Sequence, residues 1–261
     1  SHFYNQTSFL IERRIRRDGS NFDLNPFSKN DDELIGLNTN FRNSLFFNRG
    51  KQYHSTTYSF LINESQNLIN VQFDGNQNLA SVESISAKNQ SHQLQYQHLV
   101  KKSWLFNFSG STTSTESTSE NYPNRNFEIE SYQVEPKIGY LFSKNASWDI
   151  FYEFQQKENQ IGAFETLKQT RLGTSFTFNS EKGFSMNGEF SMYNNSYDGN
   201  ALSAVGFQML EGLQPGKNQT WRLLLQKNLT QYLDVNINYQ GRNSETSKTI
   251  HTGNIQLRAF F

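Results

Sequence analysis

The chain has 261 residues, enough for one domain or two, and its 24 Lys and Arg residues balance 24 Asp and Glu residues. This neutral balance offers no basic surface for nucleic acid, so we expect no nucleic-acid partner. Cysteine is absent, which excludes disulfides and thiolate metal sites. The sequence contains no apolar run of about eighteen residues, so no transmembrane helix is predicted.

The predicted elements are all strands, because apolar and polar side chains alternate along most of the chain. Successive side chains of a strand point to opposite faces, so alternation gives one apolar face and one polar face. The alternation is clearest at 233–240 and 184–192. We predict twelve strands, at 2–16, 33–48, 52–64, 85–100, 103–118, 126–143, 147–160, 165–179, 183–197, 218–229, 232–245 and 249–261.

The sixth strand is irregular. Pro136 cannot donate a hydrogen bond to a neighbouring strand. Phe127 and Ile129 occupy odd positions, whereas the apolar residues from Val134 to Phe142 occupy even ones. A one-residue bulge near 130–136 would account for both features, so the sequence predicts one there.

Short and long connections alternate between these strands. Tight turns are predicted at 49–51, 101–102, 143–146, 180–183 and 230–231, and longer loops at 17–32, 65–84, 119–125 and 198–217. Outer-membrane barrels alternate short periplasmic turns with long extracellular loops. The pattern therefore predicts an all-β fold, a transmembrane antiparallel up-and-down β-barrel of about twelve strands, or fourteen if strands are missing from this sequence.

Aromatic residues flank the short turns, as an aromatic girdle at a membrane interface would. The alternative is that these rings form the core of a soluble sandwich, but the predicted strands exceed the usual soluble length of about 5–6 residues. The rings are Phe47, Tyr53, Trp104, Tyr140, Phe142, Trp148, Phe178, Phe184, Tyr232, Phe260 and Phe261.

A Ser/Thr-rich stretch covers 111–121. We interpret it as the continuation of a strand beyond the bilayer into an exposed hairpin. A mucin-like segment or a linker is the alternative, which the absence of proline within the stretch disfavours.

No catalytic, cofactor-binding or metal-ligating residue is predicted, and no cofactor is expected. The five histidines are His2, His54, His92, His98 and His251, and the two that share a strand face are about 20 Å apart, too far to hold one metal. A barrel hydrolase would need one of them beside a serine and a polar orienting group. The acidic run at 31–33, with Asp18 and Asp23, lacks the EF-hand spacing of a calcium site.

Alternation places charges of both signs on the inner face. Antiparallel register around the 143–146 turn predicts Lys137 opposite Glu153, and the last two strands should place Arg258 near Asp234. Mixed charge favours a filled or narrow lumen, because selective pores usually carry one sign. The inner charges are Arg42, Glu135, Lys137, Asp149, Glu153, Arg171, Glu189, Arg222, Asp234 and Arg258.

The segment 206–218, with Trp221, residues 239–242 and 250–253, and the terminal Phe261, resembles the carboxyl-terminal barrel region of large Bacteroidota outer-membrane proteins, most of which have no assigned activity. The resemblance covers about the last quarter of the chain. It implies a Gram-negative outer membrane and recognition of Phe261 by the barrel-assembly machinery. We expect residues 1–261 to form one barrel domain, the C-terminal part of a longer precursor.

These features predict a non-enzymatic barrel that acts as a structural anchor or as an accessory subunit of an outer-membrane complex for secretion, assembly or surface display. The alternatives are a passive channel for small polar solutes and, less favoured, a barrel hydrolase. The expected partners are membrane lipids, lipopolysaccharide and other outer-membrane or surface proteins. We expect the C-terminus on the periplasmic side.

Overall fold

A computed structural model describes residues 2–16, 33–49, 52–71, 81–119, 122–181, 183–230 and 232–259. The predicted loop at 17–32 and the terminal Phe260 and Phe261 lie outside the described residues. The described residues include two short helices, η1 (Pro123–Arg125) and α1 (Ala204–Leu210). The strands are β1 (His2–Arg16), β2 (Glu33–Arg49), β3 (Gln52–Val71), β4 (Ser81–Val100), β5 (Trp104–Ser119), β6 (Phe127–Ser143), β7 (Ala146–Asn159), β8 (Thr166–Ser180), β9 (Phe184–Asp198), β10 (Gly216–Thr230), β11 (Leu233–Ser244) and β12 (Ser247–Ala259).

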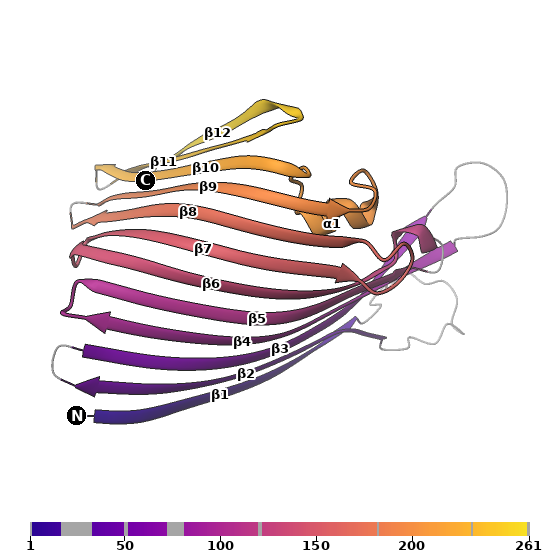
Figure 1. Ribbon diagram of the computed structural model, residues 1–261, viewed down its shortest axis with the longest axis horizontal. Helices are drawn as coiled ribbons and strands as arrows, with labels where there is room; N and C mark the ends of the chain where they lie inside the picture. Colours follow the sequence, from indigo (N-terminus) through magenta and orange to yellow (C-terminus); the bar gives the residue numbers. More distant parts are fainter. Residues whose placement is uncertain are drawn as a thin grey trace.

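The strands form one curved sheet in which every strand pairs with its neighbour in the chain (Figure 1). All eleven pairings among the described strands are antiparallel and run in the order β1 to β12, which confirms the predicted all-β, up-and-down arrangement. Both chain ends lie with the short connections at one end of the sheet, and α1 lies at the other (Figure 1). Among the described residues, no helix is both long enough and apolar enough to cross a membrane.

Most strand boundaries fall within a few residues of the prediction. The exceptions are β3 and β4, whose pairing continues to Val71 opposite Ser81, well past the predicted ends. Residues 65–71 have adjacent apolar residues at Leu68 and Ile69, so the extension lacks the regular apolar alternation that identified the other strands. Its backbone pairing is nevertheless regular.

The predicted bulge in β6 is wrong, although the pairing of β6 with β7 is interrupted at Glu135 and Pro136. Pairing of β6 with β5 runs without a register shift from Trp104 opposite Tyr140 to Ser117 opposite Phe127, and Pro136 takes its place opposite Phe108. The change in apolar phase has another cause. Phe127 and Ile129 point to the inner face because they pack there in an apolar cluster with the residues of α1.

The polarity of the two faces of the sheet is the reverse of that in a water-soluble protein, because polar side chains are buried on one face and apolar side chains are exposed on the other. On β7, residues 151, 153, 155, 157 and 159 are buried, and four of these five are polar or charged. The other face carries exposed apolar side chains. We call the face that α1 covers the inner face and the opposite one the outer face.

Rows of apolar side chains cross the outer face from strand to strand. Phe106, Ile138 and Ile150 lie opposite one another on β5, β6 and β7, with 40%, 49% and 45% of their surfaces exposed. An aromatic row nearer the short turns joins Trp104 to Tyr140, with ring centroids 4.9 Å apart, and continues to Trp148. The outer face is thus apolar over the part of the sheet next to the short turns.

The two edge strands each pair on one side. β1 pairs with β2 and β12 pairs with β11, and no pairing between β1 and β12 is present among the described residues. Because the number of strands is even and every pairing is antiparallel, β1 and β12 also run in opposite directions. Both edges therefore retain main-chain groups that can accept another strand.

Candidate functional site

The inner face carries a charge network centred on Arg171 of β8. Its Nη1 donates to Glu153 Oε2 at 3.4 Å, its Nη2 to Glu189 Oε1 at 2.5 Å, and its Nε to Ser191 Oγ at 3.1 Å. One guanidinium thus joins carboxylates from β7 and β9. Such pairing is what a buried charge requires, because an unpaired charge in a low-dielectric interior is costly.

The register places all the predicted inner charges on the inner face. The specific prediction for Lys137 is wrong, because this residue lies opposite Phe151 and not Glu153. The turn pairs Ser143 with Ala146, and the register then shifts by one residue before Leu141 pairs with Ser147. The partner of Lys137 therefore lies two residues from the predicted Glu153. The prediction for the last hairpin is confirmed in register, with Asp234 opposite Arg258.

Phe151 fills the space beside this network. Its side chain is buried and lies across Gly173, where an added Cβ would overlap the ring. The Arg171 guanidinium carbon lies 4.6 Å from the ring centroid and the Lys137 Nζ lies 5.4 Å from it. Both cations are close enough for cation–π attraction. An aromatic ring and salt-bridged charges therefore occupy this part of the inner face.

Helix α1 was missed by the sequence reasoning, which assigned 198–217 to a long loop. Ser203 caps the helix by accepting a hydrogen bond from the Gly206 backbone N–H, and Glu211 ends it in the left-handed conformation, with φ 54°. Val205, Met209 and Leu210 are buried against Leu167 and Ile129. The capping serine and the apolar spacing of 205, 209 and 210 were the available signal.

A buried lysine holds α1 on the inner face. Lys157 Nζ on β7 donates to the Met209 carbonyl oxygen at 3.0 Å and to Glu211 Oε1 at 2.5 Å. The carbonyl groups at the end of a helix have no partner within it, so an ammonium group is a suitable donor. The contact joins the 198–217 segment to β7.

Two asparagines and an arginine fix the rest of this segment. Asn195 Nδ2 and Asn218 Nδ2 both donate to the Gln214 carbonyl, at 3.0 and 2.7 Å. Arg242 Nη1 on β11 donates to the Gly212 carbonyl at 2.9 Å. The segment is therefore bonded to side chains of β7, β9, β10 and β11.

A hollow of about 450 Å³ remains on the inner face beside this segment. Charges of both signs line it: Glu189, Glu211, Arg222 and Arg242. Its volume falls within the range of about 300–1,000 Å³ that is typical of small-molecule pockets. The hollow is the polar space left between the sheet and the inward-folded segment.

Three of the described histidines bond to tyrosines. His54 Nδ1 lies 2.8 Å from the Tyr96 hydroxyl, and His251 Nδ1 lies 2.9 Å from that of Tyr239. His92 Nδ1 makes the same contact with Tyr58, at 2.8 Å. Within the described ranges, no group of three or more His, Asp or Glu residues could hold a metal ion. Asp18, Asp23, Asp31 and Asp32 lie outside those ranges.

Comparisons with known proteins give only remote likenesses. No protein-family model matches the chain, and no curated protein matches its sequence. The transport unit of the autotransporter AIDA-I from Escherichia coli is 10% identical, with a TM-score of 0.36 over 99% of this chain and 90% of that one. The translocator domain of the autotransporter NalP from Neisseria meningitidis is 9% identical, with a TM-score of 0.36 over 87% and 82%. Such values are too low to support a conclusion about this chain.

Proposed function

We propose that the chain forms an outer-membrane β-barrel that serves as a structural anchor or as an accessory subunit of an outer-membrane complex for secretion, assembly or surface display. The inverted polarity of the sheet carries this proposal. Phe106, Ile138 and Ile150 are exposed, whereas Glu153 and Lys157 are buried. Exposing a large apolar side chain to water forgoes about 1.5–3 kcal/mol, so whole rows of them fit hydrocarbon better than water.

The membrane also explains the strand architecture. A bilayer offers no hydrogen-bond partner for the backbone, so only helices and closed sheets can cross it. The edges of β1 and β12 must therefore be paired in the membrane. They pair either with each other or through further strands, which would make a larger barrel.

The inner face favours an anchor over an open channel. Its charges are joined across strands through Arg171, and α1 is held over the end of the sheet by Lys157. Groups that bond to one another and to a folded segment leave less space for solute than a water-filled lumen lined by free charges.

The orientation follows from the lengths of the connections. We propose that the end with the short turns, and with it the C-terminus, faces the periplasm, and that the end with α1 faces the cell surface. Outward rings near the short turns, including Trp104 and Trp148, would form an aromatic girdle at the inner interface. The barrel-assembly machinery would recognise the terminal Phe261. Lipids and lipopolysaccharide would surround the outer face, and no catalysis is proposed.

Conductance in planar bilayers separates the anchor from its principal alternative, a passive channel. The full-length protein should give no steady open current, because α1 and the paired charges obstruct the inner space. A variant that lacks residues 203–212 is the matched control and should conduct better. Steady open currents from the unmodified protein would favour the channel.

The anchoring role has a separate test. Full-length protein extracted from its native membrane in mild detergent should carry outer-membrane or surface proteins in fixed stoichiometry after chemical cross-linking. Recovery of the protein alone, in a folded state, would contradict a role as an anchor or accessory subunit.

A further inference from the structure

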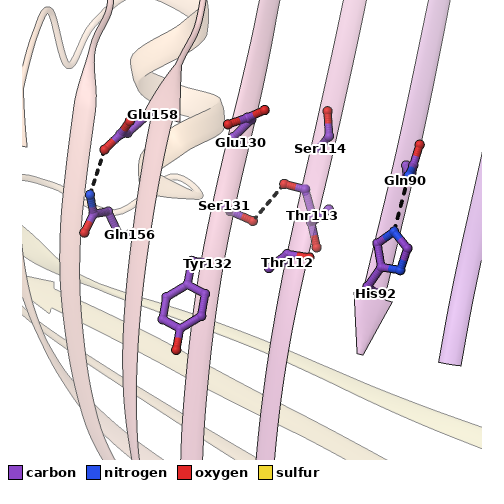
Figure 2. A pocket seen from close by; sticks show the side chains of 10 residues that line it. All are labelled: Gln90, His92, Thr112, Thr113, Ser114, Glu130, Ser131, Tyr132, Gln156 and Glu158. Atoms are coloured by element: carbon purple, nitrogen blue, oxygen red, sulfur yellow. Dashed lines mark hydrogen bonds between the residues drawn. The ribbon is translucent and has the colours of Figure 1, made fainter. Parts of the chain in front are cut away.

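The outer face has a hollow beyond the apolar rows, toward the cell-surface end of β4 to β7 (Figure 2). Its volume is about 460 Å³, within the range of about 300–1,000 Å³ typical of ligand pockets. The register arranges the side chains that line it in two adjacent rows. One row is Gln90, Ser114, Glu130 and Glu158, and the other is His92, Thr112, Tyr132 and Gln156.

The Ser/Thr-rich stretch of the sequence creates this hollow. Thr112 and Ser114 on β5 have short side chains, while His92 on β4 and Tyr132 on β6 are long and stand on either side. A strand of small residues between strands of large ones leaves a groove, because the side chains of one face stand side by side. We call the space lined by these two rows the outer groove.

The groove presents hydroxyl groups and two carboxylates. Each carboxylate accepts a hydrogen bond on one of its two oxygens, since Gln156 Nε2 donates to Glu158 Oε1 at 2.7 Å and Gln160 Nε2 donates to Glu130 Oε2 at 3.3 Å. The other oxygen of each can accept a hydrogen bond from a ligand hydroxyl.

The His92 ring is engaged on both nitrogens, with Gln90 Nε2 at 3.3 Å and the Tyr58 hydroxyl at 2.8 Å. The hydroxyls of Thr112 and Ser114 are the neutral groups between the two sides, and Tyr132 is 51% exposed. Two acidic groups disfavour a phosphate ligand, whereas a sugar offers hydroxyls to the polar groups and C–H faces to the ring.

The side chains beside the outer groove indicate that its ligand is an amphiphile. The row next to the groove on the side of the short turns is Leu94, Gly110, Val134 and Phe154, which is apolar throughout. A lipid whose sugar occupied the groove would lay its acyl chains along this row. A free sugar would leave the row without a matching contact.

We propose that the outer groove binds the core oligosaccharide of an outer-leaflet glycolipid. The proposal rests on the proposed function, because it requires the outer face to meet lipid. Polar groups of β4 to β7 contact the sugar, and Leu94, Val134 and Phe154 contact the acyl chains.

The test uses full-length protein folded in detergent micelles, with binding measured by native mass spectrometry. The probes are lipopolysaccharide that carries its core oligosaccharide, lipid A without the core, and the free core oligosaccharide. The first should bind about tenfold more tightly than either of the others, a ratio that one or two retained hydrogen bonds would produce. Equal binding of lipopolysaccharide and lipid A would overturn the proposal, and so would equal binding of the free sugar.

Two tryptophan variants provide a matched pair. Thr112→Trp fills the groove and should abolish the preference for core-bearing lipopolysaccharide. Ser196→Trp adds the same bulk on the outer face of β9, in line with the Thr112 row through Lys168, and should retain the preference. Equal loss in both variants, or none in Thr112→Trp, would contradict the groove as the site.

Folding is read separately from binding, through the heat-dependent shift in electrophoretic mobility of detergent-folded barrels. A wild-type chain that stays unfolded in micelles would overturn the proposed function, and this inference with it. A chain that folds but does not distinguish the lipids would overturn only the inference. Glu130→Gln, which is nearly isosteric, should fold normally and weaken lipopolysaccharide binding, since it replaces a charged acceptor of sugar hydroxyls with a neutral one.

Discussion

At the scale of single residues, the inner face is fitted closely enough for one methyl group to matter. Gly173→Ala should destabilise the protein by about 1–3 kcal/mol, because overpacking forces neighbouring side chains from their preferred positions. The new Cβ would overlap the buried Phe151 ring, which lies beneath Arg171 and cannot swing freely. Urea-dependent unfolding in detergent measures the effect.

Gly188→Ala is the control for that substitution. A Cβ there would lie 3.9 Å from Leu223 Cδ1, an ordinary contact, so the variant should be neutral or slightly more stable. A double variant, Phe151→Ala with Gly173→Ala, should lose less stability than the sum of its parts. Additive losses would mean that the ring and the glycine do not meet.

Cross-strand residue pairs also show how much of the structure could be predicted from the sequence. The register between Asp234 and Arg258 follows from a short hairpin with a clear alternation, and it is present. The partner of Lys137 depended on how Ser143 and Ala146 pair across their turn, which side-chain alternation does not specify. A shift of two residues preserves the face of every side chain, so the face could be predicted and the partner could not.

At the scale of elements, the strands were predictable and the helix was not. Strand alternation extends over a dozen residues or more in most elements, whereas α1 has seven residues and depends on its contacts with the sheet. Short helices are marginal alone and gain stability chiefly from packing. The same packing explains β6, where apolar Phe127 and Ile129 point inward against α1 and the change of apolar phase does not mark a bulge.

Lys157→Met should release the α1 segment. The substitution keeps the length of the side chain but removes the donor to the Met209 carbonyl and the charge partner of Glu211. Limited proteolysis should then cut within 198–217 at least several times faster than in the wild type, as expected when a buried charged contact is lost.

Lys168→Met is the matched control for the released segment. Lys168 is exposed on the outer face of the neighbouring strand, opposite Gln156, and its replacement should leave the cleavage rate unchanged. Equal protection of both variants would show that Lys157 does not hold α1 in place.

At the scale of the whole molecule, the unpaired edges of the sheet at β1 and β12 lead to a testable prediction. In a membrane the outward amides of β1 and β12 must be bonded, since unpaired backbone groups there are costly. Hydrogen exchange of the full-length protein in detergent should therefore protect these edge amides as strongly as those of β7. Fast exchange along both edges would contradict a closed barrel.

The most direct test of membrane embedding uses spin labels along β7. The chain has no cysteine, so single cysteines introduced at positions 148 to 155 can each carry one label. In lipid vesicles, labels at Trp148, Ile150, Tyr152 and Phe154 should collide freely with dissolved oxygen and little with a polar nickel complex, whereas labels at 149, 151, 153 and 155 should be shielded from oxygen. A reversed pattern, or equal oxygen collision at odd and even positions, would contradict a sheet whose outer face lies in hydrocarbon.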